Sequence, residues 1–197
     1  MDLLELIKSN ENQIENINID DIKLDNISLE DVECQKVVFN KCNITSSKLE
    51  NSSFYNVSFN NCNFANTSFE NSTFHNCKFD NCKIEGANFI ENSMFEVLFT
   101  STNANFVNLS NATLRNITFT DTSLKNSYFQ EDKVKNIKFD NANLTQAQFF
   151  RTSLNNVDLS SSIIEGLSIS LEDIKGAIIN ELQSIDLLYL IGVKLKK

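Results

Sequence analysis

Residues 52–89 read SSFYN-VSFNN-CNFAN-TSFEN-STFHN-CKFDN-CKIEG-ANF, with a large apolar side chain at the centre of every five. The same register gives 34 central positions from Ile14 to Ile179, all apolar, which hold 13 of the 16 phenylalanines. A period of five matches neither an α-helix, with about 3.6 residues per turn, nor a strand, with alternation every two. We therefore interpret the chain as one that turns a corner every five residues and directs one large side chain inward each time.

A second column, two residues before the centre, holds small or β-branched residues. Its members include Val37, Cys42, Ser47, Ser52, Val57, Cys62, Thr67, Ser72, Cys77, Cys82 and Ala87. Asparagines recur at the corner, as at Asn56, Asn76, Asn116, Asn136 and Asn156. Asparagine tolerates the backbone angles of turns. This explains how a chain with no proline and only 4 glycines can turn so often.

The order small, Asn or Asp, Leu or Phe, polar, Asn or Gly resembles the motif of the pentapeptide-repeat family. Ala142-Asn-Leu-Thr-Gln146 and Ala87-Asn-Phe89 carry it most closely. The resemblance covers residues 12–179 and implies an all-β fold, a right-handed quadrilateral β-helix of about 8 coils. Residues 20 apart should then stack on coils about 4.8 Å apart.

Both ends of such a solenoid need a cap. Residues 1–11 form the expected N-terminal cap, since Leu3, Leu4, Leu6 and Ile7 make a short amphipathic stretch. Residues 180–197 should form a helix and a strand. Asn180 suits a helix N-cap, Gly192 suits the residue after a helix, and Val193–Leu195 resembles a short strand.

This terminal segment resembles that of the Qnr/MfpA quinolone-resistance subgroup, in the spacing of Ile179, Asn180, Gln183, Leu187, Leu188, Gly192 and Val193. The resemblance implies a homodimer joined tail to tail. The expected interface is formed by Leu182, Ile185, Leu188, Tyr189, Ile191 and Val193. A helix that merely caps the core is the alternative. Unlike many Qnr proteins, the chain has no inserted loops between repeats, which brings it closer to the MfpA-like members.

The net charge of −9 argues against direct nucleic-acid binding and allows a basic partner. Two of the four sides carry most of the excess of acids. The candidate acidic binding surface comprises Glu30, Glu50, Glu70, Asp80, Asp121 and Asp140. Glu30, Glu50 and Glu70 fall 20 residues apart and should form an outward ladder of like charge.

The residues of enzymatic chemistry are missing from the pattern. His75 is the only histidine, and its outward position beside Phe74 indicates a solvated side chain rather than a catalyst. A Ser-His-Asp set would need a second histidine, which the sequence does not have. Cys42, Cys62 and Cys82 should stack inside the coil as small core residues, because inward thiols on stacked strands cannot converge on a metal. We expect no enzyme activity, no cofactor and no membrane span. With no leader sequence evident, we expect a cytoplasmic protein with reduced thiols.

One interruption stands out at Ala104, which underfills its column and predicts a local bulge near residues 100–107. For function, the subgroup resemblance implies a DNA-mimic-like protein that binds DNA gyrase or topoisomerase IV and protects it from quinolones. The alternative is a generic protein-binding scaffold with another partner, since one fold serves many functions.

Overall fold

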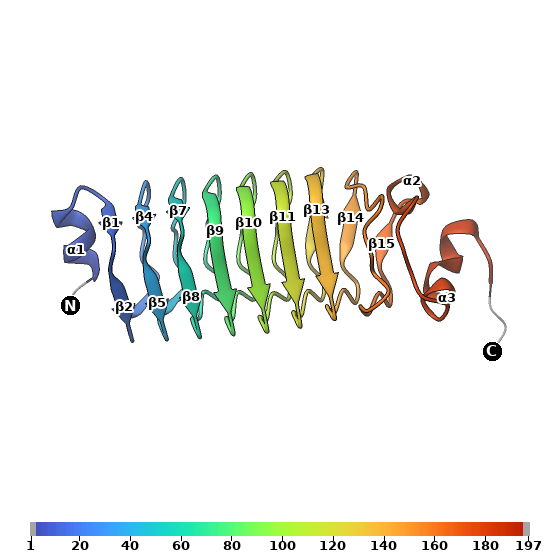
Figure 1. Cartoon of the computed structure of the whole chain (residues 1–197), viewed down its shortest axis with the longest axis horizontal. Coiled ribbons are helices and arrows are strands. Elements are labelled where there is room, and N and C mark those ends of the chain that lie inside the picture. The colour runs from blue at the N-terminus through green and yellow to red at the C-terminus, as the bar shows by residue number, and fades with distance from the viewer. Residues whose placement is uncertain (1–2, 195–197) are drawn as a thin grey trace.

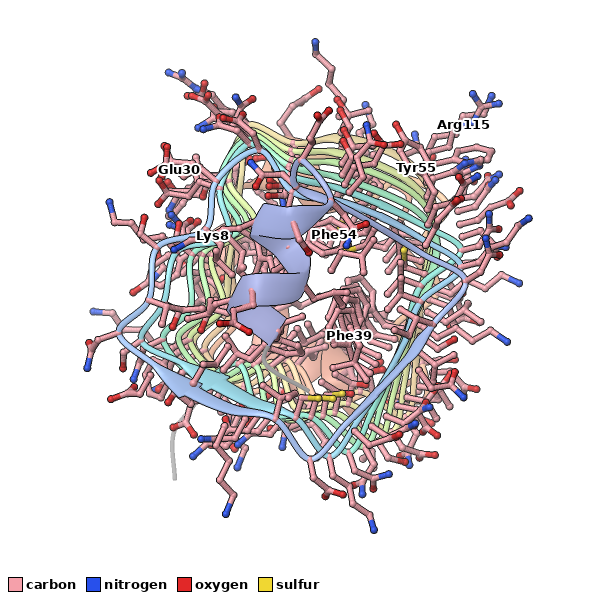
Figure 2. All side chains as sticks on the ribbon, turned by 90° about the vertical axis from the view of Figure 1, so that its left-hand side faces the viewer. Lys8, Glu30, Phe39, Phe54, Tyr55 and Arg115 are labelled. Carbon is pink, nitrogen blue, oxygen red and sulfur yellow. The ribbon has the colours of Figure 1, made fainter. Side chains whose placement is uncertain are left out.

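The computed structural model describes residues 3–194 and is a β-solenoid of about eight coils, closed by helices at both ends (Figure 1). Seen along its axis, each coil has four sides, with Phe39 and Phe54 inside and Tyr55 and Arg115 outside (Figure 2). This confirms the expected fold class. The arrangement follows from the five-residue period, because each corner redirects the chain before a strand can grow long.

Most strands are only three residues long. The elements are α1 (Leu3–Ser9), β1 (Gln13–Glu15), β2 (Asn18–Asp20), β3 (Lys23–Asp25), β4 (Glu33–Gln35), β5 (Val38–Asn40), β6 (Asn43–Thr45), β7 (Ser53–Tyr55), β8 (Ser58–Asn60), β9 (Thr73–Asp80), β10 (Ser93–Thr100), β11 (Thr113–Thr120), β12 (Tyr128–Gln130), β13 (Lys133–Asp140), β14 (Gln148–Phe150), β15 (Ser168–Ile169), α2 (Leu171–Ile174), α3 (Gln183–Leu187) and the 3-10 helix η1 (Leu188–Ile191).

Paired strands are parallel, and each residue lies beside the residue 20 positions later. Phe59 pairs with Phe79 between β8 and β9, and Phe79 pairs with Phe99 between β9 and β10. The register stays constant through β11 and β13, where Phe119 pairs with Phe139. The five-residue spacing therefore places equivalent side chains in files along the axis.

The central column forms the core. All its members are buried except the half-buried Leu24, Leu29, Val134, Ile174 and Ile179. In the file from Phe39 to Phe139 the rings are stacked, with centroids 4.6 to 5.4 Å apart. Offset or parallel stacking adds to the free energy of burying each ring, which is about 1.5–3 kcal/mol.

Every fifth residue from Glu11 to Asn156 has a positive φ, and half of these corners are asparagine. The corner side chains also join neighbouring coils. The Nδ2 of Asn76 donates to the Oδ1 of Asn56 at 2.6 Å, and Asn136 donates in the same way to Asn116 at 2.9 Å. Asparagine thus turns the chain and links the coils.

The small column contributes an internal ladder of polar contacts. The amide of Ser52 donates to the hydroxyl of Ser72 at 3.0 Å, and the amide of Ser72 donates to the Oδ1 of Asn92 at 2.8 Å. Further along, the amide of Ala112 donates to the Oδ1 of Asp132 at 2.8 Å. A buried carboxyl group therefore stands where most coils carry a hydroxyl or a small apolar group.

The bulge expected near residues 100–107 is wrong. Ala104 is buried in its column. Its amide donates to the backbone carbonyl of Ser123 at 2.7 Å, which is the regular hydrogen bond between neighbouring coils. Phe106 is simply a corner residue, with a φ of 59° and its side chain 51% exposed. The coil accommodates the small alanine because Ile84 and Leu124 occupy the same file on either side.

The ends differ from the regular coils. Leu3 and Ile7 of α1 are buried against the first coil. At the other end, α2 replaces a corner, and the hydroxyl of Ser170 caps it by accepting the amide of Asp173 at 3.0 Å. The strand expected at Val193–Leu195 is wrong at Val193 and Lys194, which are not in a strand, and Leu195 lies outside the described residues.

Candidate binding surfaces

The thiol groups belong to the core of the solenoid. All five cysteines are free and buried. Burial raises the pKa of the Cys34 thiol to about 12 and that of the Cys77 thiol to about 11, so both stay protonated. Within residues 3–194 no group of His, Cys, Asp or Glu is placed to hold a metal ion. No helix in that range is long and apolar enough to cross a bilayer.

The first half of the acidic surface lies on adjacent coils. Glu30 is exposed, and Glu50 and Glu70 are half-buried. The carboxylate of Glu50 lies 3.9 Å from the ammonium of Lys48, and that of Glu70 accepts the Nδ2 of Asn88 at 3.1 Å. These two carboxylates therefore have neighbouring partners, which offset the repulsion expected within a file of like charges.

The second half is dispersed. Asp80 and Asp140 share a file, but Thr100 and Thr120 stand between them. Asp121 occupies a corner, where it accepts the Nδ2 of Asn141 at 2.5 Å. The structure therefore brings Glu30, Glu50 and Glu70 together and leaves the three aspartates apart.

The C-terminal segment is anchored by Gln183. Asn180 and Gln183 form a reciprocal capping box, with bonds of 3.0 Å and 2.8 Å between each amide and the other side chain. The Nε2 of Gln183 also donates to the carbonyls of Leu159 and Ser162, at 2.8 Å and 2.6 Å. The Tyr189 hydroxyl donates to the carbonyl of Leu167. The segment thus caps the last coil.

The same segment leaves large apolar side chains in solvent. We call this set the C-terminal apolar end; its members are Leu182, Ile185, Tyr189, Ile191 and Val193. Leu182 is the most exposed of them, at 77%, whereas the sixth expected interface residue, Leu188, is half-buried. Large apolar side chains exposed together on one short segment are typical of contact sites on soluble proteins.

A row of outward aromatic side chains was not predicted. We call it the aromatic strip; it comprises Tyr55, His75 and Phe95, on three successive coils. The ring centroids of Tyr55 and His75 are 6.2 Å apart, and those of His75 and Phe95 are 5.0 Å apart. The guanidinium of Arg115 lies 5.2 Å from the Phe95 ring centre. The signal for this strip was in the sequence, since these residues fall 20 apart at an outward position.

The regular ladder of backbone hydrogen bonds is interrupted after β13. Within residues 3–194, no backbone hydrogen bond joins β13 to residues 153–160, the equivalent stretch of the next coil. A groove of about 780 Å³ lies there, lined by Asn116, Thr118, Asn136, Ile137, Lys138, Phe139, Asp140, Asn156, Asp158 and Ser161. We call the unpaired side of β13 the open edge. Its local sequence obeys the five-residue pattern, so the sequence carried no direct sign of it.

Comparison with protein families places the repeats over most of the chain. A model described as a pentapeptide repeat region matches residues 72–149, one of pentapeptide repeats in nine copies matches residues 29–83, and one in eight copies matches residues 134–166. No curated protein matches the chain significantly.

Solved structures align with most of the chain at low identity. A trypsin-treated variant of QnrB1, a plasmid-mediated fluoroquinolone resistance protein, aligns with a TM-score of 0.49 at 15% identity, over 90% of this chain and 99% of that one. HetL from Nostoc sp. strain PCC 7120, a pentapeptide repeat protein involved in heterocyst differentiation regulation, aligns with a TM-score of 0.42 at 14% identity, over 90% and 92%.

Proposed function

Because the chain belongs to the pentapeptide-repeat family, we propose that it acts without catalysis, as a rigid scaffold that dimerises and binds a protein partner through its outer sides. The observation that carries the proposal is the C-terminal apolar end. A free monomer would keep these side chains in water, and a second copy would cover them. A twofold joint of this kind is self-complementary, so one patch serves both subunits.

For the partner, we propose DNA gyrase or topoisomerase IV, with protection from quinolones as the outcome. Support comes from the terminal residues that match the Qnr/MfpA spacing, from Ile179 to Val193, and from the net charge of −9. A dimer carries twice this charge along a rod of about 80 Å, at the usual coil spacing. B-DNA of that length carries about 47 charges. The proposed mimicry is therefore one of shape more than of charge.

Gyrase supercoiling with the purified protein, with and without ciprofloxacin, tests the partner. Inhibition or protection at micromolar protein is the expected result. If the protein neither inhibits nor protects gyrase or topoisomerase IV, this part of the proposal is refuted. The protein would then act as a scaffold for another partner.

Analytical ultracentrifugation tests the dimer. Leu182→Asp should convert a dimer into a monomer without unfolding it, because the side chain it replaces is already 77% exposed. Leu98→Asp, on a side of the rod away from this segment, is the matched control and should stay dimeric. A wild-type monomer, or a variant that dimerises like the wild type, would contradict the tail-to-tail joint.

A second candidate partner surface is the aromatic strip. Tyrosine and arginine are enriched among residues that dominate binding energy, and here Tyr55 and Arg115 stand at the two ends of a file of half-buried, outward-facing rings. This favours the alternative function, a scaffold for a protein other than a topoisomerase. Tyr55→Ala together with Phe95→Ala should then abolish capture of that partner and leave any effect on gyrase unchanged.

A further inference from the structure

The interruption after β13 is local. Elsewhere the amide of a central residue donates to the carbonyl 19 residues later, as from Leu124 to Asn143 at 2.8 Å. By this rule Val134 should donate to Ser153, and Phe139 to Asp158; neither bond is formed within residues 3–194. Corner Asn136 equally lacks its bond to Asn155. The backbone ladder is therefore missing along both sides that β13 spans. Side chains still join the two coils at its ends, where the hydroxyl of Thr152 accepts the amide of Asp132 at 3.0 Å and the hydroxyl of Ser162 donates to the carbonyl of Phe139 at 3.2 Å.

The neighbouring contacts remain in place, so the two coils separate on one flank alone. Leu144 still donates to Ile163 at 2.8 Å, and β14 still pairs with β15. Beyond the opening the ladder resumes, with Leu154 donating to Asp173 at 2.8 Å. Val134 is half-buried, whereas the equivalent residues in β9, β10 and β11 are buried. The next coil therefore covers Val134 less completely. The result is an opening bounded on one side by the free edge of β13 and on the other by residues 153–160, which form no strand.

An unpaired edge presents backbone donors and acceptors in the geometry of a strand, and it is a template for another extended segment. The free donors of the open edge are the amides of Val134, Asn136 and Phe139, which form no backbone bond within residues 3–194. Backbone groups carry obligatory hydrogen-bonding capacity, which an added strand would satisfy.

Charge indicates what kind of segment fits. Lys133, Lys135 and Lys138 all point outward from β13, are exposed, and form no ion pair within residues 3–194. Arg115 lies directly beside Lys135 on the preceding coil. Like charges in adjacent positions repel each other, so stability alone does not favour this basic cluster. The cluster also has the opposite sign to the net charge of the whole chain, which is −9.

We propose that the open edge is a docking site for an extended, acidic segment of a partner polypeptide, which adds to β13 as a strand. Its backbone pairs with the free amides, and its outward carboxylates lie opposite the three lysines. Asp140 and Asp158 at the far end of the groove limit the acidic part of the segment to the side of the lysines. This surface lies on the flank of the rod, so it neither requires nor excludes the dimer.

Amide hydrogen exchange tests the opening itself. Because β11 is paired with β13, the amides at its equivalent positions, Leu114, Asn116 and Phe119, serve as the matched reference. The free amides of the open edge should exchange on the order of 100-fold faster than these. Equal protection in the two sets would show that the edge is closed, and would overturn the proposal.

Peptide binding tests the occupant. The probe is a fluorescein-labelled octapeptide, Glu-Val-Glu-Asn-Val-Glu-Val-Thr, compared by anisotropy with the same peptide carrying lysine for glutamate and with an N-methylated acidic version. The acidic probe should bind and protect the open-edge amides, and the other two should bind about tenfold more weakly or worse. The double variant Lys135→Glu/Lys138→Glu should lose the acidic probe, and Lys23→Glu, on β3, should keep it. Equal binding of all three peptides, no binding of the acidic one, or an unaffected double variant would each overturn the proposal.

Discussion

Replacing Asp132 with asparagine should remove a large part of the pH dependence of folding. The carboxyl group is only 7% exposed. Its Oδ1 accepts the amide of Ala112 at 2.8 Å, and its Oδ2 has no partner within residues 3–194. Burial raises the pKa of Asp132 from 3.8 to about 8, although the amide bond acts in the opposite direction. The folded protein therefore holds this proton at neutral pH.

The sign and size follow from proton linkage. Between pH 4 and pH 8 the folded state binds one proton more than the unfolded chain, so the free energy of unfolding decreases as pH rises, by about 1.4 kcal/mol per pH unit. Stability from this group is greatest below pH 4 and is lost as pH rises through the folded pKa near 8. From pH 5 to pH 8 the loss is about 4 kcal/mol.

Urea denaturation followed by circular dichroism at pH 5, 6, 7 and 8 measures this slope. Asparagine should fit the site, since Asn92 occupies the same file and makes the same bond to an amide. Asp132→Asn should therefore be more stable than the wild type at pH 8, with the difference narrowing toward pH 5. Asp140→Asn, an exposed change at the end of β13, the strand that follows Asp132, controls for overall charge and should leave the slope as it is. Parallel curves for the wild type and Asp132→Asn would show that the Asp132 carboxyl group is not the source of the slope.

Three other predictions concern the corners, the core and the thiols. Phe106→Asn should raise the free energy of unfolding by about 1 kcal/mol, because asparagine adopts a positive φ more readily; a lower melting temperature would contradict this. Phe79→Ala removes a buried ring stacked 4.6 Å and 4.9 Å from its neighbours, and should cost about 3–5 kcal/mol in urea denaturation. The control for this core variant is Phe150→Ala, at an exposed position, which should change stability by less than about 0.5 kcal/mol. The five cysteines should react with Ellman's reagent only after unfolding, and rapid labelling of the native protein would show the core to be open.

The core could be read from the sequence because inward and outward positions are fixed by a short period. The column of large residues, the cysteines and the asparagine corners all fall where the period placed them. The bulge expected near Ala104 is absent, because a single position of the repeat does not determine how the core is filled. In a stacked fold the residues one coil away on either side, Ile84 and Leu124, decide whether a small side chain leaves a gap.

The candidate surfaces were harder to predict. The C-terminal apolar end follows from apolar residues outside the repeat, whereas the open edge depends on hydrogen bonds between coils. Ser161 illustrates the difficulty. It occupies a corner position but lacks the positive φ of the regular corners, and its hydroxyl, in place of a backbone carbonyl, accepts the amide of Asn141 at 3.1 Å. Nothing in the local sequence distinguishes this serine from the corner serines Ser46 and Ser101, which are regular.

Because the series of corners from Glu11 to Asn156 is uninterrupted, the number of residues between two sites fixes both their separation along the axis and the angle between them. Inserting or deleting 20 residues would move everything beyond that point along the axis by one coil, about 4.8 Å, and leave its angular position unchanged. Inserting or deleting five would instead turn everything beyond it by one side of the square. The number of repeats therefore sets the distances and the angles between the aromatic strip, the open edge and the C-terminal apolar end. Duplication or loss of repeats in the gene would change these distances by whole coils and these angles by whole sides.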